Sequence, residues 1–181
     1  IGFLWSRKEI LEKIPPFFGG GEMIEDVFMD RSTWAELPHK FEAGTPAIAE
    51  AIGLAAAIKY INNIGIDHIN DYEKNITQYL FEKMHQIEDL KIIGPTPDID
   101  PKRGSLATFY VKDIHSNDIA EILDSKGICI RSGHHCCQPL HRHIGMNSTA
   151  RISMNFTTSK DDIDIFIEKL KETINFLKVN S

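Results

Sequence analysis

One short segment gathers most of the side chains in this chain that could do chemistry. Residues 131–140 read RSGHHCCQPL, so two cysteines, two histidines and an arginine lie within ten positions. A glycine precedes the cysteines and a proline follows them, which is typical of an exposed loop. The thiolate is the reactive form of cysteine, and neighbouring positive charge favours it, so Arg131, His134 and His135 could activate Cys136. The pattern therefore indicates a site with a reactive thiol.

Two other interpretations of this loop have to be weighed. It could be a surface loop in which two cysteines are adjacent by chance, or a metal site. The residue types that bind zinc are His134, His135, Cys136, Cys137, His141 and His143. Zinc ligands usually come as spaced pairs that converge on one ion, whereas adjacent side chains point apart, so we expect no metal here. Cys129 lies singly among aliphatic residues, and we expect it to be buried and structural.

The loop also carries a resemblance to a known family. Arg-Ser-Gly-His-His-Cys-x-Gln-Pro, residues 131–139, resembles the active-cysteine signature of the group II cysteine desulfurases, which are pyridoxal-phosphate (PLP) enzymes of the class V aminotransferase-like family. Residues 40–46, KFEAGTP, resemble the family's Arg-Phe-Glu-Ala-Gly-Thr-Pro, with Lys40 where relatives usually carry arginine. Residues 15–24, PPFFGGGEMI, are similar to its glycine-rich segment. The order and spacing of the three segments match the family.

The resemblance implies a fold and a domain organisation. It implies an α/β chain that is the C-terminal part of a fold-type I PLP-dependent transferase. Residues 1–44 would be the end of the large PLP-binding domain, residues 45–65 a bridging helix, and residues 66–181 a small C-terminal α/β domain that carries the cysteine loop. In relatives the lysine that forms the Schiff base with PLP precedes the strand that corresponds to residues 1–5. We therefore expect a fragment without that lysine, inactive alone.

The resemblance also assigns roles to individual residues. Cys136 would be the nucleophile that takes the substrate sulfur as a persulfide. Arg151 would bind the substrate carboxylate, for which a guanidinium offers a planar fork of donors, and Arg131 would support the loop or the substrate. Thr45 and Gly44 would contact the PLP phosphate at the start of a helix, where backbone N–H groups are free.

The function that follows is a cysteine desulfurase, which converts L-cysteine to L-alanine and leaves an enzyme persulfide for iron–sulfur cluster assembly. Such an enzyme would act as a homodimer and pass its sulfur to an acceptor protein. Cys137 departs from the family, in which a small residue without a thiol is more usual, and we expect it to be passive. Two alternatives stay open: a selenocysteine lyase, which shares the signature, and a zinc-binding interaction module that uses the His/Cys loop.

Composition limits the remaining function classes. With 181 residues, 42% hydrophobic residues and 25% charged residues, the chain is typical of a soluble globular protein. The net charge of −6 and the lack of a basic run argue against a nucleic-acid partner. No apolar stretch approaches the ~20 residues of a membrane span, so we expect no membrane partner. Three cysteines cannot build a disulfide framework, which favours a reducing compartment, the cytoplasm or an organelle of a eukaryotic cell.

Apolar periodicity and breaker residues predict the elements that must position these side chains. The expected helices are 7–13, a helix from Thr45 as N-cap to Gly65, 67–87, 116–126 with Ser116 as N-cap, and 159–178 with a capping box from Ser159 to Asp162. The expected strands are 1–5, 23–29, 33–35, 91–93, 106–111, 128–131 and 151–156. The alternation of helices and strands after residue 66 indicates a layered α/β domain.

Overall fold

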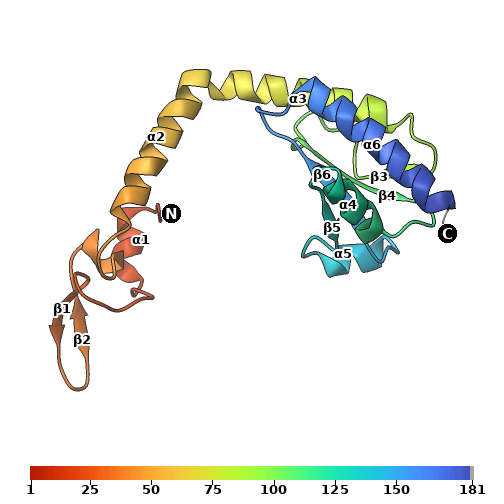
Figure 1. Ribbon diagram of the computed structural model, residues 1–181. Helices are drawn as coiled ribbons and strands as arrows, with labels where there is room; N and C mark the ends of the chain where they lie inside the picture. Colours follow the sequence, from red (N-terminus) through yellow and green to blue (C-terminus); the bar gives the residue numbers. More distant parts are fainter. Residues whose placement is uncertain (180–181) are drawn as a thin grey trace. The chain divides into compact units, whose positions relative to one another are not determined.

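The computed structural model describes residues 1–179, and the chain divides into two compact units at Ile64 and Gly65 (Figure 1). Gly65 has a φ of +93°, a conformation that is easy only for glycine, and it separates two long helices. The first of them, α2 (Ile48–Ile64), ends at this glycine as expected, and the second, α3 (Ile66–Met84), begins directly after it.

The first unit consists of short elements and one long helix. Helix α1 (Lys8–Lys13) is followed by the antiparallel hairpin of β1 (Ile24–Val27) and β2 (Ser32–Trp34), by the 3-10 turn η1 (His39–Phe41) and by α2. The strands predicted over 23–29 and 33–35 are therefore confirmed, and they pair as a hairpin. The predicted strand over residues 1–5 is wrong, because a strand needs a hydrogen-bonded neighbour and no described strand pairs with this segment.

Two of the sequence segments that carry the family resemblance meet in this unit. The backbone N–H of Gly44 donates to the carbonyl oxygen of Gly21 over 2.9 Å, so the glycine-rich segment lies beside the KFEAGTP segment. The ammonium group of Lys40 donates to the carbonyl oxygens of Leu11 and Glu12 over 3.0 Å each, at the end of α1. Lys40 therefore satisfies carbonyl groups that a helix end leaves without a partner.

The start of α2 differs from the prediction. The helix begins at Ile48, and its first hydrogen bond joins the N–H of Ala51 to the carbonyl of Ala47, so Thr45 is not its N-cap. Gly44 has a φ of +78°, and its N–H is bound to Gly21. This bond turns the chain toward the glycine-rich segment, and the helix starts only after the turn.

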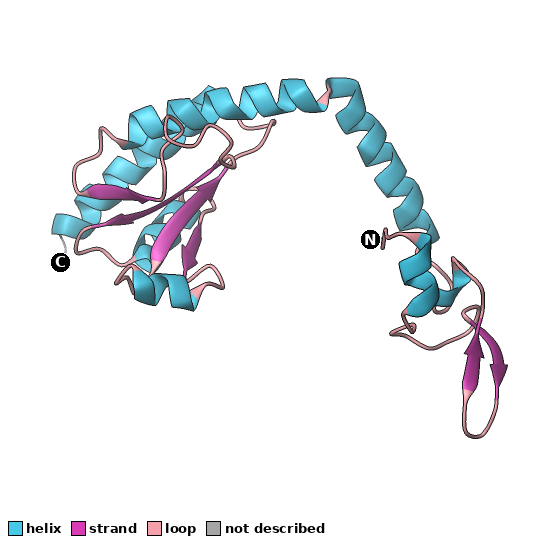
Figure 2. Ribbon diagram, turned by 180° about the vertical axis from the view of Figure 1, so that it is seen from behind, coloured by secondary structure: helices cyan, strands magenta, loops and turns pink. Residues whose placement is uncertain are grey.

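The second unit is a sheet covered by helices (Figure 2). Its four strands are all antiparallel and lie in the order β3-β4-β6-β5. They are β3 (Leu90–Ile93), β4 (Leu106–Val111), β5 (Arg131–Gly133) and β6 (Thr149–Ser153). The helices are α3, α4 (Ser116–Ser125), α5 (Gln138–His143) and α6 (Lys160–Val179). The predicted α/β layering is confirmed.

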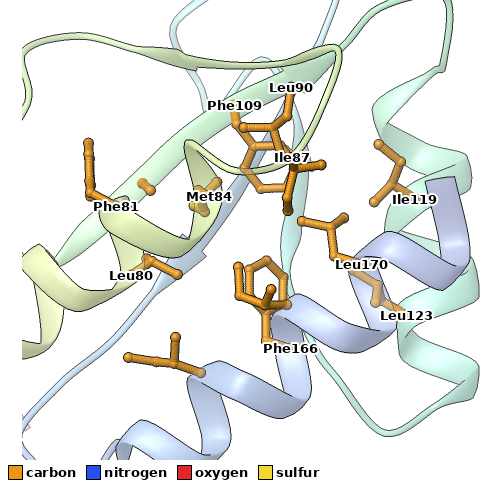
Figure 3. Packing of buried hydrophobic residues seen from close by; sticks show 14 of the residues in the cluster. Leu80, Phe81, Met84, Ile87, Leu90, Phe109, Ile119, Leu123, Phe166 and Leu170 are labelled. Carbon is orange, nitrogen blue, oxygen red and sulfur yellow. The ribbon is translucent and has the colours of Figure 1, made fainter.

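The core of this unit lies between one face of the sheet and three helices (Figure 3). Strand β4 alternates, so that Ala107, Phe109 and Val111 are buried, and Phe109 meets Phe166 of α6 edge to face with ring centroids 6.5 Å apart. Burying a phenylalanine of this kind contributes about 1.5–3 kcal/mol. Buried side chains from the helices are Ile76, Leu80, Phe81 and Met84 of α3, Ile119 and Leu123 of α4, and Ile163, Phe166, Ile167, Leu170 and Ile174 of α6. The helix predicted over 159–178 is thus confirmed, with Leu177 partly buried at its end.

Hydrogen bonds at the helix ends confirm one predicted element boundary and correct two others. The capping box is confirmed, since the N–H of Asp162 donates to the hydroxyl of Ser159 and the Ser159 N–H donates to the Asp162 carboxylate. The cap of α4 is His115 rather than Ser116, because the Asn117 N–H donates to its imidazole. The strand predicted over 128–131 begins only at residue 131, because the N–H of Ile128 closes α4 on the carbonyl of Leu123.

None of the helices formed by residues 1–179 combines the length and the apolar character needed to cross a bilayer.

Candidate active site around Cys136

The cysteine loop is a tight turn between β5 and α5. The N–H of Cys137 donates to the carbonyl of His134 over 2.8 Å, and the two central residues, His135 and Cys136, have φ values of 52° and 61°. Residues other than glycine rarely adopt this left-handed conformation, which costs on the order of 1–3 kcal/mol at each position. The surrounding structure must therefore hold the turn in place. Pro139, predicted to end a loop, instead lies in the first turn of α5, a helix that the sequence reasoning missed.

The turn exposes the Cys136 thiol at an open pocket of about 550 Å3. The guanidinium Nη2 of Arg131 lies 3.2 Å from the Cys136 sulfur and donates to it. A guanidinium in this position is the partner that a charge-assisted hydrogen bond to a thiolate requires. The residues that line the pocket are Arg131, Ser132, His134, His135, Cys136, Gln138 and Pro139.

The other two thiols are also free and exposed. Cys137 occupies the N-cap position of α5, and its side chain makes no hydrogen bond to that helix. The expectation of a buried Cys129 is wrong: its sulfur lies 3.6 Å from a carboxylate oxygen of Asp124 at the surface. Because the N–H of Ile128 bonds back to Leu123 of α4 and the strand begins only at Arg131, Cys129 lies outside the sheet.

Strand pairing brings Arg151 next to the same site. Arg131 of β5 is directly opposite Arg151 of β6, so both side chains lie on the same face of the sheet. The Arg151 partner in β4 is Thr108, which alternates with the buried Ala107 and Phe109, so this face is opposite to the one that the core covers. The two residues with anion-binding side chains that the sequence singled out are therefore neighbours.

The two arginines have no acidic partner in the described part of the chain. Arg151 is half-buried, and its Nε is buried without a hydrogen-bond partner among residues 1–179. Like charges directly opposite each other in a sheet repel, and a buried donor without a partner is unfavourable. A carboxylate between the two guanidiniums would relieve both conditions.

A buried hydroxyl that the sequence reasoning missed connects the loop to β6. Thr149 is fully buried, and its Oγ1 lies 2.9 Å from Nε2 of His135 and 3.0 Å from Nε2 of His141. The imidazoles of His134 and His141 meet edge to face, with their ring centroids 5.3 Å apart. The three histidines thus attach the loop to β6 and to α5. Thr149 precedes Arg151 by two positions, and this period of two was the only sequence signal that placed it on the same face.

Burial, followed by the nearby charges of Arg151, Arg131 and His141, holds the pKa of His135 below its ordinary value of 6.5. We expect its imidazole to titrate below pH 6.5 in an NMR titration of the folded chain. The unfolded chain then binds this proton first, so His135 contributes stability above pH 6.5 that is lost as the pH falls through the lower, folded pKa. Urea unfolding across this range measures the loss, and a ring midpoint at or above the ordinary value would contradict the prediction.

Metal binding finds no support in the described residues. Among them, no three side chains of the types His, Cys, Asp and Glu are grouped so that they could hold one ion. A further pocket of about 380 Å3 lies between α3 and residues 101–105, and its lining contains neither cysteine nor histidine.

Thr45 and Gly44 lie in the first unit. Thr45 is exposed and makes no hydrogen bond to any residue from 1 to 179, whereas the N–H of Gly44 is already bound to Gly21. Of the two, only Thr45 has donors available for a ligand.

Comparison with known proteins places the chain in a family. Residues 1–166 match the family model for class V aminotransferases. A probable cysteine desulfurase from Synechocystis sp. is 52% identical over 176 residues, which are 97% of this chain and 42% of that protein. The chain thus spans less than half the length of this relative.

Solved structures show the same likeness. The apo structure of a cysteine desulfurase from Thermococcus onnurineus NA1 matches with a TM-score of 0.85 and 36% identity, over 94% of this chain and 42% of that one. A mutant of C-DES with glycine covalently linked to the PLP cofactor matches in fold, with a TM-score of 0.71 and 20% identity over 92% of this chain and 40% of that one. The resemblance first seen in three short segments is confirmed, and the chain belongs to the class V aminotransferase family.

Proposed function

We propose that this chain is part of a PLP-dependent cysteine desulfurase that supplies sulfur for iron–sulfur cluster assembly. The observation that carries the proposal is the exposed Cys136 sulfur, 3.2 Å from the guanidinium of Arg131, with Arg151 directly opposite on the next strand. A reactive thiol and a carboxylate-binding arginine on one face of a sheet are what such a reaction requires of the protein. The family membership supports it independently.

The chain offers part of a site for PLP. Thr45 is exposed, has free donors and follows the turn at Gly44, so it suits a phosphate oxygen, and Gly44 contributes the shape of the turn rather than its N–H. No lysine lines the Cys136 pocket in the described part of the chain, and in our proposal the Schiff-base lysine comes from elsewhere in the enzyme. When bound, PLP withdraws electrons from the amino acid and weakens its carbon–sulfur bond.

The residues of this chain perform the steps around that bond. Arg151 binds the carboxylate of L-cysteine with two parallel hydrogen bonds and orients its sulfur. The Cys136 thiolate, paired with Arg131, attacks that sulfur: an S–S bond forms, the C–S bond breaks, and its electron pair stays on the carbon. The carbon takes up a proton and leaves as L-alanine, while Cys136 holds the sulfur as a persulfide. An exposed turn suits the next step, the attack of an acceptor thiol.

We further propose that the enzyme is a cytoplasmic homodimer that hands the sulfur to an acceptor protein. The exposure of Cys136 on an open pocket is consistent with access by a protein thiol. The free cysteines of the described residues are consistent with a reducing compartment.

A chimera tests the proposed function. This chain would replace the matching segment of the Synechocystis relative. The two are 52% identical over 176 residues. We expect the chimera, given PLP and L-cysteine, to release alanine and sulfide in equal amounts in the presence of a reducing thiol. The chain alone is the control and should release neither. Turnover of selenocysteine without turnover of cysteine would favour a selenocysteine lyase, and no turnover of either by a folded, PLP-loaded chimera would contradict the proposal.

A further inference from the structure

The hydroxyl of Thr149 is shared by two imidazoles. It lies 2.9 Å from Nε2 of His135 and 3.0 Å from Nε2 of His141, and it is fully buried. A hydroxyl has one hydrogen and two lone pairs, so it can donate to only one of these nitrogens and accepts from any nitrogen that carries a hydrogen. The direction of the two hydrogen bonds then fixes where the protons of both rings lie.

His141 sets that direction. Its Nδ1 lies 3.1 Å from the carbonyl oxygen of Cys137, which can only accept, so Nδ1 carries the hydrogen. In the neutral ring Nε2 is then an acceptor and takes the hydroxyl hydrogen of Thr149. The Thr149 oxygen in turn accepts from Nε2–H of His135. Hydrogen bonds therefore run from His135 through Thr149 and His141 to the backbone of the cysteine turn itself.

This order leaves Nδ1 of His135 without a hydrogen. That atom is buried and has no hydrogen-bond partner among the described residues, so a hydrogen there would be a buried donor without an acceptor. The charged and titratable groups that face the ring are Arg131 of β5, Arg151 of β6 and His141 of α5, and all of them oppose a second proton. The neutral ring protonated at Nε2 fits both conditions.

We propose that Thr149 is a positioning residue: its hydroxyl fixes His135 as the tautomer protonated at Nε2 and so fastens the left-handed turn at His135 and Cys136 to strand β6. The strained turn carries the thiol, and the side chain of His135 ties this turn to Thr149, which does not line the pocket. The proposal depends on the proposed function only in taking Cys136 as the reacting thiol.

Nitrogen NMR of the histidine rings tests the tautomers directly. The 181-residue chain, labelled with 15N, is compared with T149S, which keeps the hydroxyl, and with T149V, which replaces it by a methyl group of similar shape. Near neutral pH we expect the wild type and T149S to carry hydrogen at Nε2 of His135 and Nδ1 of His141, and T149V to lose the preference at His135. A hydrogen at Nδ1 of His135 in the wild type, or unchanged rings in a folded T149V, would overturn the proposal. If T149V does not fold, the first two proteins still decide it.

Alkylation of the thiol gives a second measure. In a C129A/C137A background Cys136 is the only cysteine, and its reaction with iodoacetamide can be followed by mass spectrometry. We expect T149V to react about fivefold more slowly than T149S, the factor that one lost hydrogen bond is typically worth. Equal rates would show that the hydroxyl does not position the thiol. Neither measurement needs cofactor or turnover, so failure of the proposed function would leave both results standing.

Discussion

Replacing Cys136 by serine should abolish sulfur transfer in the chimeric enzyme. A serine hydroxyl stays protonated near neutral pH and is a poor nucleophile toward sulfur, so it cannot take over the role of the thiolate. The variant should still fold, because the replaced side chain is exposed and its turn is held by His135 and the backbone. Persulfide on the protein, detected by mass spectrometry after addition of L-cysteine, should fall to background.

The adjacent thiol provides the matched control. Cys137 is also exposed, but no described guanidinium donates to its sulfur, whereas Arg131 donates to that of Cys136. C137A should keep most of the activity and all of the persulfide on Cys136. The reverse pattern, with activity lost in C137A and kept in C136S, would mean that the nucleophile is the second thiol.

Replacing Arg151 by lysine should reduce kcat/KM for L-cysteine by about ten- to a hundredfold. The lysine keeps the charge but loses the planar fork, and a charge-assisted hydrogen bond is typically worth about 1.5–3 kcal/mol. Nε of this guanidinium is buried without a hydrogen-bond partner in the described part of the chain, so it can bind a ligand carboxylate. Steady-state kinetics on the chimera measure the effect.

The PLP absorbance of the same variant separates two roles for Arg151. In our proposal the phosphate is held by Thr45, so PLP binding should survive R151K. R142K is the control, since Arg142 is exposed on α5 and its guanidinium donates only to Gln138 among the described residues, and it should leave cysteine use unchanged. Loss of PLP together with cysteine use in R151K would instead identify a phosphate ligand, and unchanged kinetics a structural residue.

The sequence predicted those parts of the site that depend on local pattern. The cysteine, its arginine neighbour and the alternating strand of Arg151 are all readable from residue types and spacing. Thr149 was not predictable, because its role depends on two histidines brought to it by α5 and by a turn with positive φ. Helix α5 itself was missed because Pro139 is typical of a loop, although proline also suits the first turn of a helix.

The fold was predicted to a similar depth. Apolar periodicity identified α3 and α6, because burial repeats at the helical period over many residues. The starts of α2 and β5 and the N-cap of α4 were misplaced, since each is decided by one hydrogen bond. The bonds from Gly44 to Gly21 and from Ile128 to Leu123 are made by backbone groups that every residue type possesses.

Strand β6 carries Thr149 and Arg151 on one face and Ala150 and Ile152 on the other. Insertion or deletion of one residue in this strand would exchange the faces, bury an arginine in the core and separate the thiol turn from its support. In a lineage that keeps this chemistry, length variation should therefore collect in the loops around β6 and spare the strand. An engineer who transplants the site would have to move the strand and the turn as one block, since neither would keep its geometry in a new host alone.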